Sequence, residues 1–280
     1  MLSQIQAWAE GINGIRTILV VGSMAGTGKQ DELSDFDISV FGDQFDFISS
    51  DNWLDQISPW VICIHEKFSL FGEQIPTRLT LFANYQKVDF SFHPQTLLSK
   101  MAGDQQLPPT YDAGFHVLVD KDQITGRLAK PTYKAYSISL PDPPAFALCQ
   151  LEFWFESYHI AKYLLRQDWW AAKSRDQALK KWLLSMMQWH AAARSAVPLK
   201  AKGEGRQLSD WMSEDWQQKL AACFSGWLED EQWAGLGATL DLFSAAAKQT
   251  ASLLGYVYNQ RAEDWMRGFI HQKKLHYHDH

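Results

Sequence analysis

A glycine-serine turn between two apolar stretches constrains this chain more than any other feature of its sequence. Residues 18–21 are all apolar, and they lead directly into Gly22 and Ser23. After a polar loop, a second stretch begins at Asp35 and alternates polar with apolar residues as far as Val40. Apolar stretches bounded by turn residues are typical of strands. The pattern therefore predicts a strand, a tight turn and a second strand.

The second of these strands places two carboxylates on one face. Because side chains alternate along an extended chain, Asp35 and Asp37 share a face with Ser39, and we expect this face to be exposed and the apolar face to be buried. Carboxylates at positions i and i+2 can share a hard cation such as Mg²⁺. The Gly22-Ser23 turn offers backbone N–H groups and a hydroxyl to phosphates. The stretch indicates metal-assisted nucleotidyl transfer.

A third carboxylate lies on a later predicted strand, at residues 87–92. Val88, Phe90 and Phe92 alternate there with Asp89, which therefore projects from the polar face. If this strand lies beside the first acidic strand, Asp89 joins the pair. It would then complete the metal site or accept the proton of an attacking hydroxyl, and the residues leave both roles open.

A competing motif lies inside the same turn region. Gly28 and Lys29 are spaced like the end of a P-loop, a signature that also needs Gly at position 23 and Ser or Thr at position 30. This chain has Ser23 and Gln30 at those positions. The sequence therefore disfavours a P-loop.

The hydrophobic pattern changes from strand-like to helical at about residue 135. We predict a helix over residues 1–13, a short helix at 51–57, and strands at 17–21, 35–40, 60–68, 78–83, 87–92 and 115–119. Residues 98–144 are rich in Pro, Gly and Asp, and predict the last edge strand and a connector. Asp142-Pro143-Pro144 is a helix start signal. Helical periodicity follows from Ala145, with later helices at about 215–228 and 230–259. The prediction is an α+β chain, with a mixed sheet in residues 1–135 and a helical bundle in 136–280.

Composition and charge restrict the possible partners. The 280 residues carry a formal charge of −6, which disfavours nucleic acid and is compatible with a cationic small substrate. We see neither a signal peptide nor a membrane-spanning stretch, and we expect a cytoplasmic protein. The odd, widely spaced cysteines fit a reducing compartment; they are Cys63, Cys149 and Cys223. Alternating histidines at positions 276, 278 and 280 could bind a transition metal, although chain ends are usually poorly ordered.

Taken together, the two halves resemble the aminoglycoside 6-adenylyltransferase family, the streptomycin adenylyltransferases, within the DNA polymerase β-type nucleotidyltransferase superfamily. The resemblance rests on separated stretches in the family's order. They are Gly22-Ser23 with Ser34-Asp35-Phe36-Asp37-Ile38, the Leu79-to-Asp89 segment ending Lys87-Val88-Asp89, Val117-Leu118-Val119-Asp120-Lys121-Asp122, Glu152-Phe153-Trp154, Ala161-Lys162-Tyr163-Leu164-Leu165-Arg166, Trp189 and Gly205-Arg206.

The resemblance implies transfer of AMP from Mg²⁺·ATP to a hydroxyl of streptomycin, with release of pyrophosphate. It also implies that residues 1–135 are the nucleotidyltransferase domain and that 136–280 are a helical domain that binds substrate and nucleotide. The implied site residues are Asp35, Asp37 and Asp89 for metal and catalysis, Gly22 and Ser23 for the phosphates, Lys162 for the triphosphate across the cleft, and Glu152, with Glu156 as a weaker candidate, for the cationic substrate.

One position departs from the family pattern, which usually reads Gly-Ser-Arg where this chain has Gly22-Ser23-Met24. A methionine cannot pair with a phosphate, so either Lys29 or another cation replaces the arginine, or nucleotide affinity is reduced. Two alternatives therefore stay open. The chain adenylylates another small hydroxyl compound, such as a lincosamide, or it is a non-catalytic nucleotide-binding module.

Overall fold

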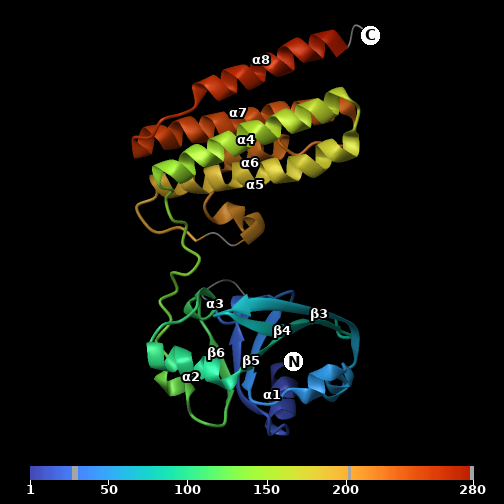
Figure 1. Cartoon of the computed structure of the whole chain (residues 1–280), viewed down its shortest axis with the longest axis vertical. Coiled ribbons are helices and arrows are strands. Elements are labelled where there is room, and N and C mark those ends of the chain that lie inside the picture. The colour runs from blue at the N-terminus through green and yellow to red at the C-terminus, as the bar shows by residue number, and fades with distance from the viewer. Residues whose placement is uncertain (27–30, 201–202, 278–280) are drawn as a thin grey trace. The chain divides into compact units, whose positions relative to one another are not determined.

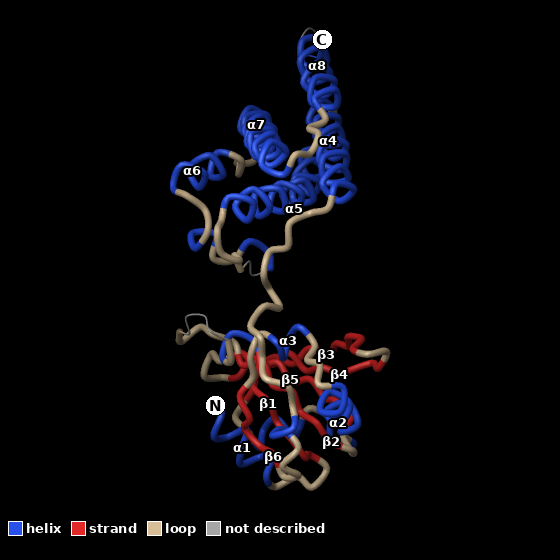
Figure 2. Tube along the Cα trace, turned by 90° about the vertical axis from the view of Figure 1, so that its left-hand side faces the viewer, coloured by secondary structure: helices blue, strands red, loops and turns tan. Residues whose placement is uncertain are grey.

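Sheet and helix are segregated along the chain. The computed structural model describes residues 1–26, 31–200 and 203–277. It divides into two compact units, Met1–Tyr136 and Ser137–His280, of which the first contains the sheet and the second is built of helices (Figures 1 and 2). The predicted α+β class is confirmed.

The first unit is organised around one six-stranded sheet with the order β3-β4-β5-β2-β1-β6. Strand β2 pairs with β5 in parallel, and every other neighbouring pair is antiparallel, so the predicted mixed sheet is confirmed. The parallel pair lies at the centre. The strands are β1 (Ile15–Val21), β2 (Phe36–Gly42), β3 (Trp60–Leu70), β4 (Glu73–Phe82), β5 (Lys87–Pro94) and β6 (His116–Asp120).

Both faces of the central strands are covered. Helix α1 (Leu2–Glu10) and the 3-10 segments η2 (Asp46–Ser49) and η3 (Asn52–Gln56) cover the face that contains Ile38 and Val40, where the predicted burial is confirmed. Helix α2 (Gln95–Asp104) and the short α3 (Pro109–Asp112) pack on the other face, which is the face of the aspartates.

The covering helices correct one prediction about the acidic face. Ser39 was expected beside the aspartates on an exposed face, but it is buried and accepts a hydrogen bond of 3.1 Å from the Tyr111 hydroxyl. Tyr111 is part of α3, so this face is covered from Ser39 onward along β2. Asp35 and Asp37 lie at the beginning of the strand, outside the covered part, and both are partly exposed.

Two helices were missed by the sequence patterns. Helix α2 lies where an irregular connector was expected to begin, and it buries Leu97, Leu98 and Met101 against the sheet. The last predicted helix, at residues 230–259, corresponds to α7 (Glu229–Leu254) but extends too far, because Gly255 adopts a left-handed conformation with φ of 70° and ends α7. Glycine adopts this conformation at no steric cost. Helix α8 (Gln260–Tyr277) begins after the predicted range and was not predicted.

The second unit is a bundle around an aromatic core. Asp142 caps its first helix by accepting a 2.8 Å hydrogen bond from the Ala145 N–H, as the start signal predicted. The rings of Phe153 and Phe243 stack with 3.5 Å between centroids, which ties the first helix to α7. This first helix is α4 (Pro143–Leu165), and the other helices of the bundle are α5 (Trp169–Arg194) and α6 (Glu214–Ala222), together with α7 and α8.

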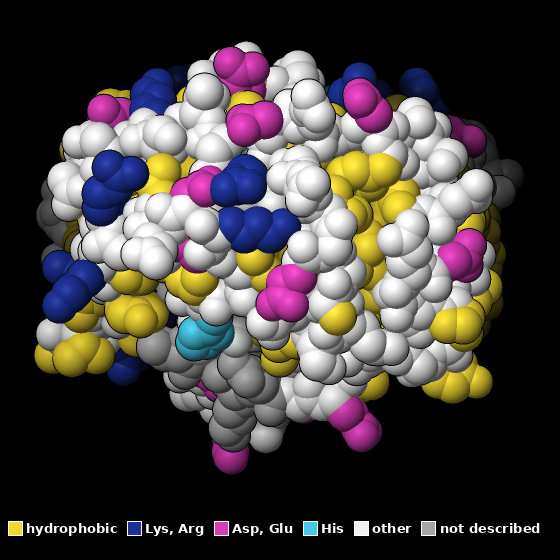
Figure 3. Space-filling view, turned by 90° about the horizontal axis from the view of Figure 1, so that it is seen from below, with side chains coloured by type: hydrophobic (Ala, Val, Ile, Leu, Met, Phe, Trp, Pro, Cys, Tyr) yellow, Lys and Arg dark blue, Asp and Glu magenta, His cyan; other side chains and the backbone are white. Residues whose placement is uncertain are grey.

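The surface carries charges of both signs. On the face shown in Figure 3, lysines and arginines lie among aspartates and glutamates, and the described atoms in this view form no extended basic field. Within the described part of the chain, no helix is long and apolar enough to cross a membrane.

Candidate active site

The two acidic strands lie side by side, as the sequence patterns allowed. In the parallel pairing of β2 with β5, the Cα of Asp37 lies directly opposite that of Asp89. Asp35 is two residues before Asp37 and shares its face. The structure therefore brings all three predicted carboxylates, the acidic cluster, to the same end of the two central strands.

A lysine that was not predicted as a site residue joins two of these carboxylates. The Lys87 ammonium lies 2.9 Å from Asp35 Oδ2 and 2.7 Å from Asp89 Oδ2. Lys87 precedes Asp89 by two residues on β5, so alternation places both side chains on the same face. The sequence could have predicted this neighbour, since residues two apart on a strand, such as Lys87 and Asp89, lie on the same face.

Burial and charge act on the ionisation of this cluster. Burial raises the pKa of Asp89 above its ordinary value, and the neighbouring ammonium of Lys87 opposes that rise. Burial acts to lower the pKa of Lys87, but hydrogen bonds to Asp89 and Asp35 outweigh it and raise that pKa. Asp89 thus favours the protonated, charged form of Lys87, and Lys87 favours the ionised form of Asp89.

Asp89 retains unused capacity for a ligand. Its Oδ1 is buried and finds no hydrogen-bond partner among the residues that the structure describes. A buried acceptor without a partner is costly and calls for an explanation such as a bound ion. The three aspartates do not converge as a set within 4.8 Å of one another in the described chain. Shared coordination of one ion would therefore require these side chains to move.

The Gly22-Ser23 turn directly adjoins the acidic strand. Gly22 has a φ of 67°, and a Cβ at this position would collide with the Asp37 carboxylate. Only glycine therefore allows the turn to approach Asp37 so closely. The Ser23 hydroxyl donates a long 3.5 Å hydrogen bond to the Asp35 carbonyl oxygen, which leaves it weakly held.

The residue after this turn packs into the protein core. Met24 is partly buried against the cluster beneath the sheet that includes Ile38 and Val88. It therefore has an apolar packing role where the family usually has an arginine. Lys29, the first cation considered as a replacement, and the P-loop-like Gly28 lie outside the described residues.

Three predicted residues lie on α4 in the second unit. Glu156 forms an ion pair of 3.1 Å with Arg175 of α5, which engages its carboxylate within the bundle. Lys162 Nζ lies 3.4 Å from His159 Nδ1 and 5.1 Å from the ring centroid of Tyr163. Glu152 and Lys162 are ten residues apart, or about 15 Å along a helix axis, so they do not form a pair.

One stretch of the family resemblance has structural roles. Asp120 accepts hydrogen bonds from the N–H and hydroxyl of Thr125 at 2.9 and 2.6 Å. The Lys121 ammonium donates to the carbonyl oxygens of Ala9 and Ile12, both at 2.9 Å, at the end of α1. The Asp120-Lys121-Asp122 stretch therefore stabilises the sheet edge and lies outside the acidic cluster.

Comparison with known proteins gives a consistent result over nearly the whole length. The family model described as streptomycin adenylyltransferase matches residues 1–273. An aminoglycoside 6-adenylyltransferase from Campylobacter jejuni is 26% identical over 266 residues, which are 93% of this chain and 90% of that protein. A protein of the same name from Bacillus subtilis strain 168 is 25% identical over 251 residues, 87% of this chain and 86% of its own length.

The solved structures include a similar chain, described as an aminoglycoside 6-adenyltransferase from Bacillus subtilis. It aligns with 98% of this chain and 97% of its own, at 21% identity and a TM-score of 0.49. The match of the family model to almost all residues confirms the resemblance found in the sequence and the predicted nucleotidyltransferase class. This chain belongs to the streptomycin adenylyltransferase family.

Proposed function

We propose that this chain transfers AMP from Mg²⁺·ATP to a hydroxyl of streptomycin and releases pyrophosphate. The observation that carries the proposal is the pairing of Asp37 with Asp89 beside the Gly22 turn, in a chain of this family. The names of the two curated relatives support an aminoglycoside acceptor. ATP as the donor supports a location in the cytoplasm, where ATP is available.

The residues of the acidic cluster fit a hard divalent cation. Carboxylate oxygens are its preferred ligands, the buried Asp89 Oδ1 has no partner in the described structure, and Lys87 already places a positive group between two of the carboxylates. We assign Asp35, Asp37 and Asp89 as the residues that hold Mg²⁺. When bound, the ion would neutralise phosphate oxygens and lower the pKa of the attacking hydroxyl.

The chain's own groups position the reactants and take up the proton. The backbone N–H groups of the Gly22-Ser23 turn, with the weakly held Ser23 hydroxyl, bind the phosphates. The acceptor oxygen attacks the α-phosphorus, the bond to pyrophosphate breaks, and the hydroxyl proton passes to Asp89. A carboxylate with a raised pKa is suited to accept that proton.

Lys87 is our candidate for the cation that Met24 does not supply. Its side chain is 36% exposed and its ammonium lies within the acidic cluster, so a side-chain rotation suffices to exchange a carboxylate partner for a phosphate. A flexible lysine provides a point charge where the family usually has an arginine fork.

In the helical unit we propose Lys162 for the triphosphate and Glu152 for the cationic acceptor. Lys162 is partly exposed, and Glu152 is partly exposed near the middle of α4. Glu156 is the weaker substrate candidate because Arg175 already engages it. Substitution of Lys162 with Met should raise KM for ATP, and Glu152→Gln should raise KM for the acceptor.

The deciding experiment measures pyrophosphate release from Mg²⁺·ATP with streptomycin, other aminoglycosides and a lincosamide. The intact chain is compared with Asp35→Asn and with Asp43→Asn, a matched substitution at an exposed aspartate beyond β2. Streptomycin-dependent release that only Asp35→Asn abolishes supports the proposal. Pyrophosphate release with a different acceptor only would mean that this acceptor, and not streptomycin, is the substrate. ATP binding without pyrophosphate release would favour a non-catalytic nucleotide-binding module.

A further inference from the structure

A second group of ligating side chains lies on the opposite face of the same sheet. Across the strands, Asp89 pairs with Leu79, and Leu79 pairs with Ile64, so these three residues share the face of the acidic cluster. Cys63 and His65 flank Ile64 on β3 and therefore point to the other face. This face is the one that η2 and η3 cover.

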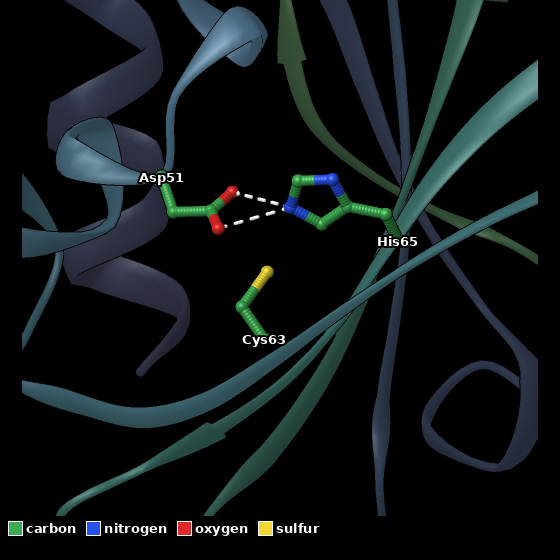
Figure 4. A group of neighbouring side chains, drawn as sticks. All are labelled: Asp51, Cys63 and His65. Carbon is green, nitrogen blue, oxygen red and sulfur yellow. Dashed lines mark hydrogen bonds and ion pairs between the residues drawn. The ribbon is translucent and has the colours of Figure 1, made fainter.

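Asp51, the residue before η3, completes the group (Figure 4). Both of its carboxylate oxygens lie 2.9 Å from His65 Nε2. One ligating atom each from Asp51, Cys63 and His65 lies within 4.8 Å of the others, which makes this a possible metal-binding group among the described residues. The three residues come from two segments that are distant in sequence and adjacent in the fold.

The donor set selects a particular class of cation. Thiolate, imidazole and carboxylate together suit Zn²⁺, whereas Mg²⁺ and Ca²⁺ take oxygen ligands. In a tetrahedral zinc site such donor atoms lie about 3.3–3.6 Å apart, so no pair of these atoms needs to close by more than about 1.5 Å. We propose that Asp51, Cys63 and His65 bind one Zn²⁺ or a similar soft divalent cation.

An arginine lies beside the carboxylate of this group. Arg78 is the cross-strand partner of His65, and its Nε lies 3.5 Å from Asp51 Oδ1. Its Nη2 donates a 2.7 Å hydrogen bond to the Ile48 carbonyl oxygen of η2, which fixes the guanidinium where it orients the carboxylate. Outer groups of this kind hold metal ligands in position.

A fourth coordination position is accessible. The His65 side chain is half exposed, and it lines a cavity of about 820 Å³ together with Ser49 and Arg78. Water can therefore complete a tetrahedral shell. On binding, the Cys63 thiol proton and any proton on His65 Nε2 pass to solvent.

The proposed ion would fasten an otherwise exposed strand. Strand β3 is at the edge of the sheet and most of its residues are exposed. Coordination by Cys63 and His65 would join this edge to Asp51 at the start of η3. The site is on the face away from the acidic cluster, so its role is independent of the proposed adenylyl transfer.

The test is a Co²⁺ titration of the full chain after treatment with a chelator. His276, His278 and His280 are first replaced with alanine, so that the histidines near the chain end do not compete. Excess Mg²⁺ is present, so that it occupies the carboxylates proposed for adenylyl transfer. We then expect the near-ultraviolet charge-transfer absorption of a cobalt-thiolate bond, saturating at one Co²⁺ per chain. Cys63→Ser should abolish this absorption and weaken binding at least about tenfold.

Matched controls keep the result specific. Cys223→Ala and His116→Ala remove a cysteine and an exposed strand histidine elsewhere, and should retain the absorption. His65→Ala should also weaken Co²⁺ binding. Because this side chain is half exposed, the variant provides the test if Cys63→Ser fails to fold. Survival of the absorption in Cys63→Ser, unchanged affinity in His65→Ala, or binding below one ion per chain would overturn the proposal. None of these readouts depends on adenylyl transfer.

Discussion

Two carboxylates, one in each unit, meet opposite electrostatic environments. Asp89 is partly buried among the acidic side chains of the first unit, where burial raises its pKa, and Asp35 and Glu66 add to that rise. Glu263 on α8 is buried. Burial acts to raise its pKa too, but hydrogen bonds from Lys248 and Arg267 outweigh burial and hold that pKa at about 2.

The difference separates the candidate site from a structural contact. Lys248 Nζ lies 2.8 Å from Glu263 Oε2, Arg267 Nε lies 2.9 Å from Oε1, and the Tyr258 hydroxyl donates to Oε2 at 2.9 Å. Glu263 thus uses both oxygens, and its Oε2 fastens α8 to Lys248 of α7. Asp89 shares Lys87 with Asp35 and keeps a buried oxygen without a partner in the described structure. An incompletely satisfied carboxylate stores binding capacity for a ligand.

The largest effect should follow from Asp37→Asn. Loss of one proposed metal carboxylate should lower kcat/KM about a thousandfold, or about 4 kcal/mol, because it removes transition-state stabilisation. Pyrophosphate release with the best acceptor measures this loss. The melting temperature should change little, since the substitution removes a charge from a crowded cluster. Retention of full turnover would refute the assignment of Asp37.

Gly22→Ala should test how closely the turn must approach that carboxylate. A side chain at φ of 67° that also collides with Asp37 should cost about 3 kcal/mol of folding stability. Urea unfolding measures the cost. Gly103→Ala in α2 is the control, because a Cβ there meets nothing within 4 Å. It should be neutral or slightly stabilising. Equal effects at both glycines would contradict the close approach.

Glu263→Gln should produce the opposite result to Asp37→Asn. Turnover per folded molecule should be retained. The free energy of unfolding should fall by about 2 kcal/mol, because the variant loses two ion pairs of a buried carboxylate whose cationic partners are partly exposed. Asp215→Asn breaks an exposed ion pair with Lys219 and should cost less than about 0.5 kcal/mol. A similar loss of unfolding free energy in Glu263→Gln and Asp215→Asn would show that the Glu263 contact is no stronger than an exposed ion pair.

The pH dependence of this contact has a definite sign. The pKa of Glu263 is lowered in the folded state, so its stabilisation is fully present above pH 4.5, the ordinary pKa, and is lost as pH falls through about 2. Urea unfolding between pH 5 and pH 2.5 should show a steeper loss for the intact chain than for Glu263→Gln. An equal loss of stability with falling pH in both proteins would show that the pKa of Glu263 is not lowered by these contacts.

The smallest effect is expected from Lys87→Met. Removal of the competing ammonium should tighten Mg²⁺ binding in the absence of ATP about fivefold, equivalent to ~1 kcal/mol for a partly exposed ion pair. Calorimetric titration with Mg²⁺ measures this change. Lys67→Met, at an exposed lysine of β3, is the control. Weaker Mg²⁺ binding in Lys87→Met would mean that Lys87 organises the carboxylates and does not compete with the ion.

Local patterns predicted most of the framework because they depend on neighbours in sequence. Alternation placed Asp35 with Asp37, and Asp142 with two prolines marked the start of α4. The patterns were wrong where a long-range contact decided the outcome. Ser39 alternates like an exposed residue, but Tyr111, 72 residues away, covers it. The predicted helix at 230–259 ran past Gly255 because apolar residues continue on both sides of it, and α8 was not predicted.

The sequence by itself determined the family, the α+β class and the three carboxylates, since each follows from residue type and short spacing. Only the tertiary structure decided which residues meet. It set Asp37 opposite Asp89, placed Lys87 between two carboxylates and brought Asp51 to Cys63 and His65. Strand order and register fix such meetings, and they depend on packing across the whole sheet, which no short stretch of sequence encodes.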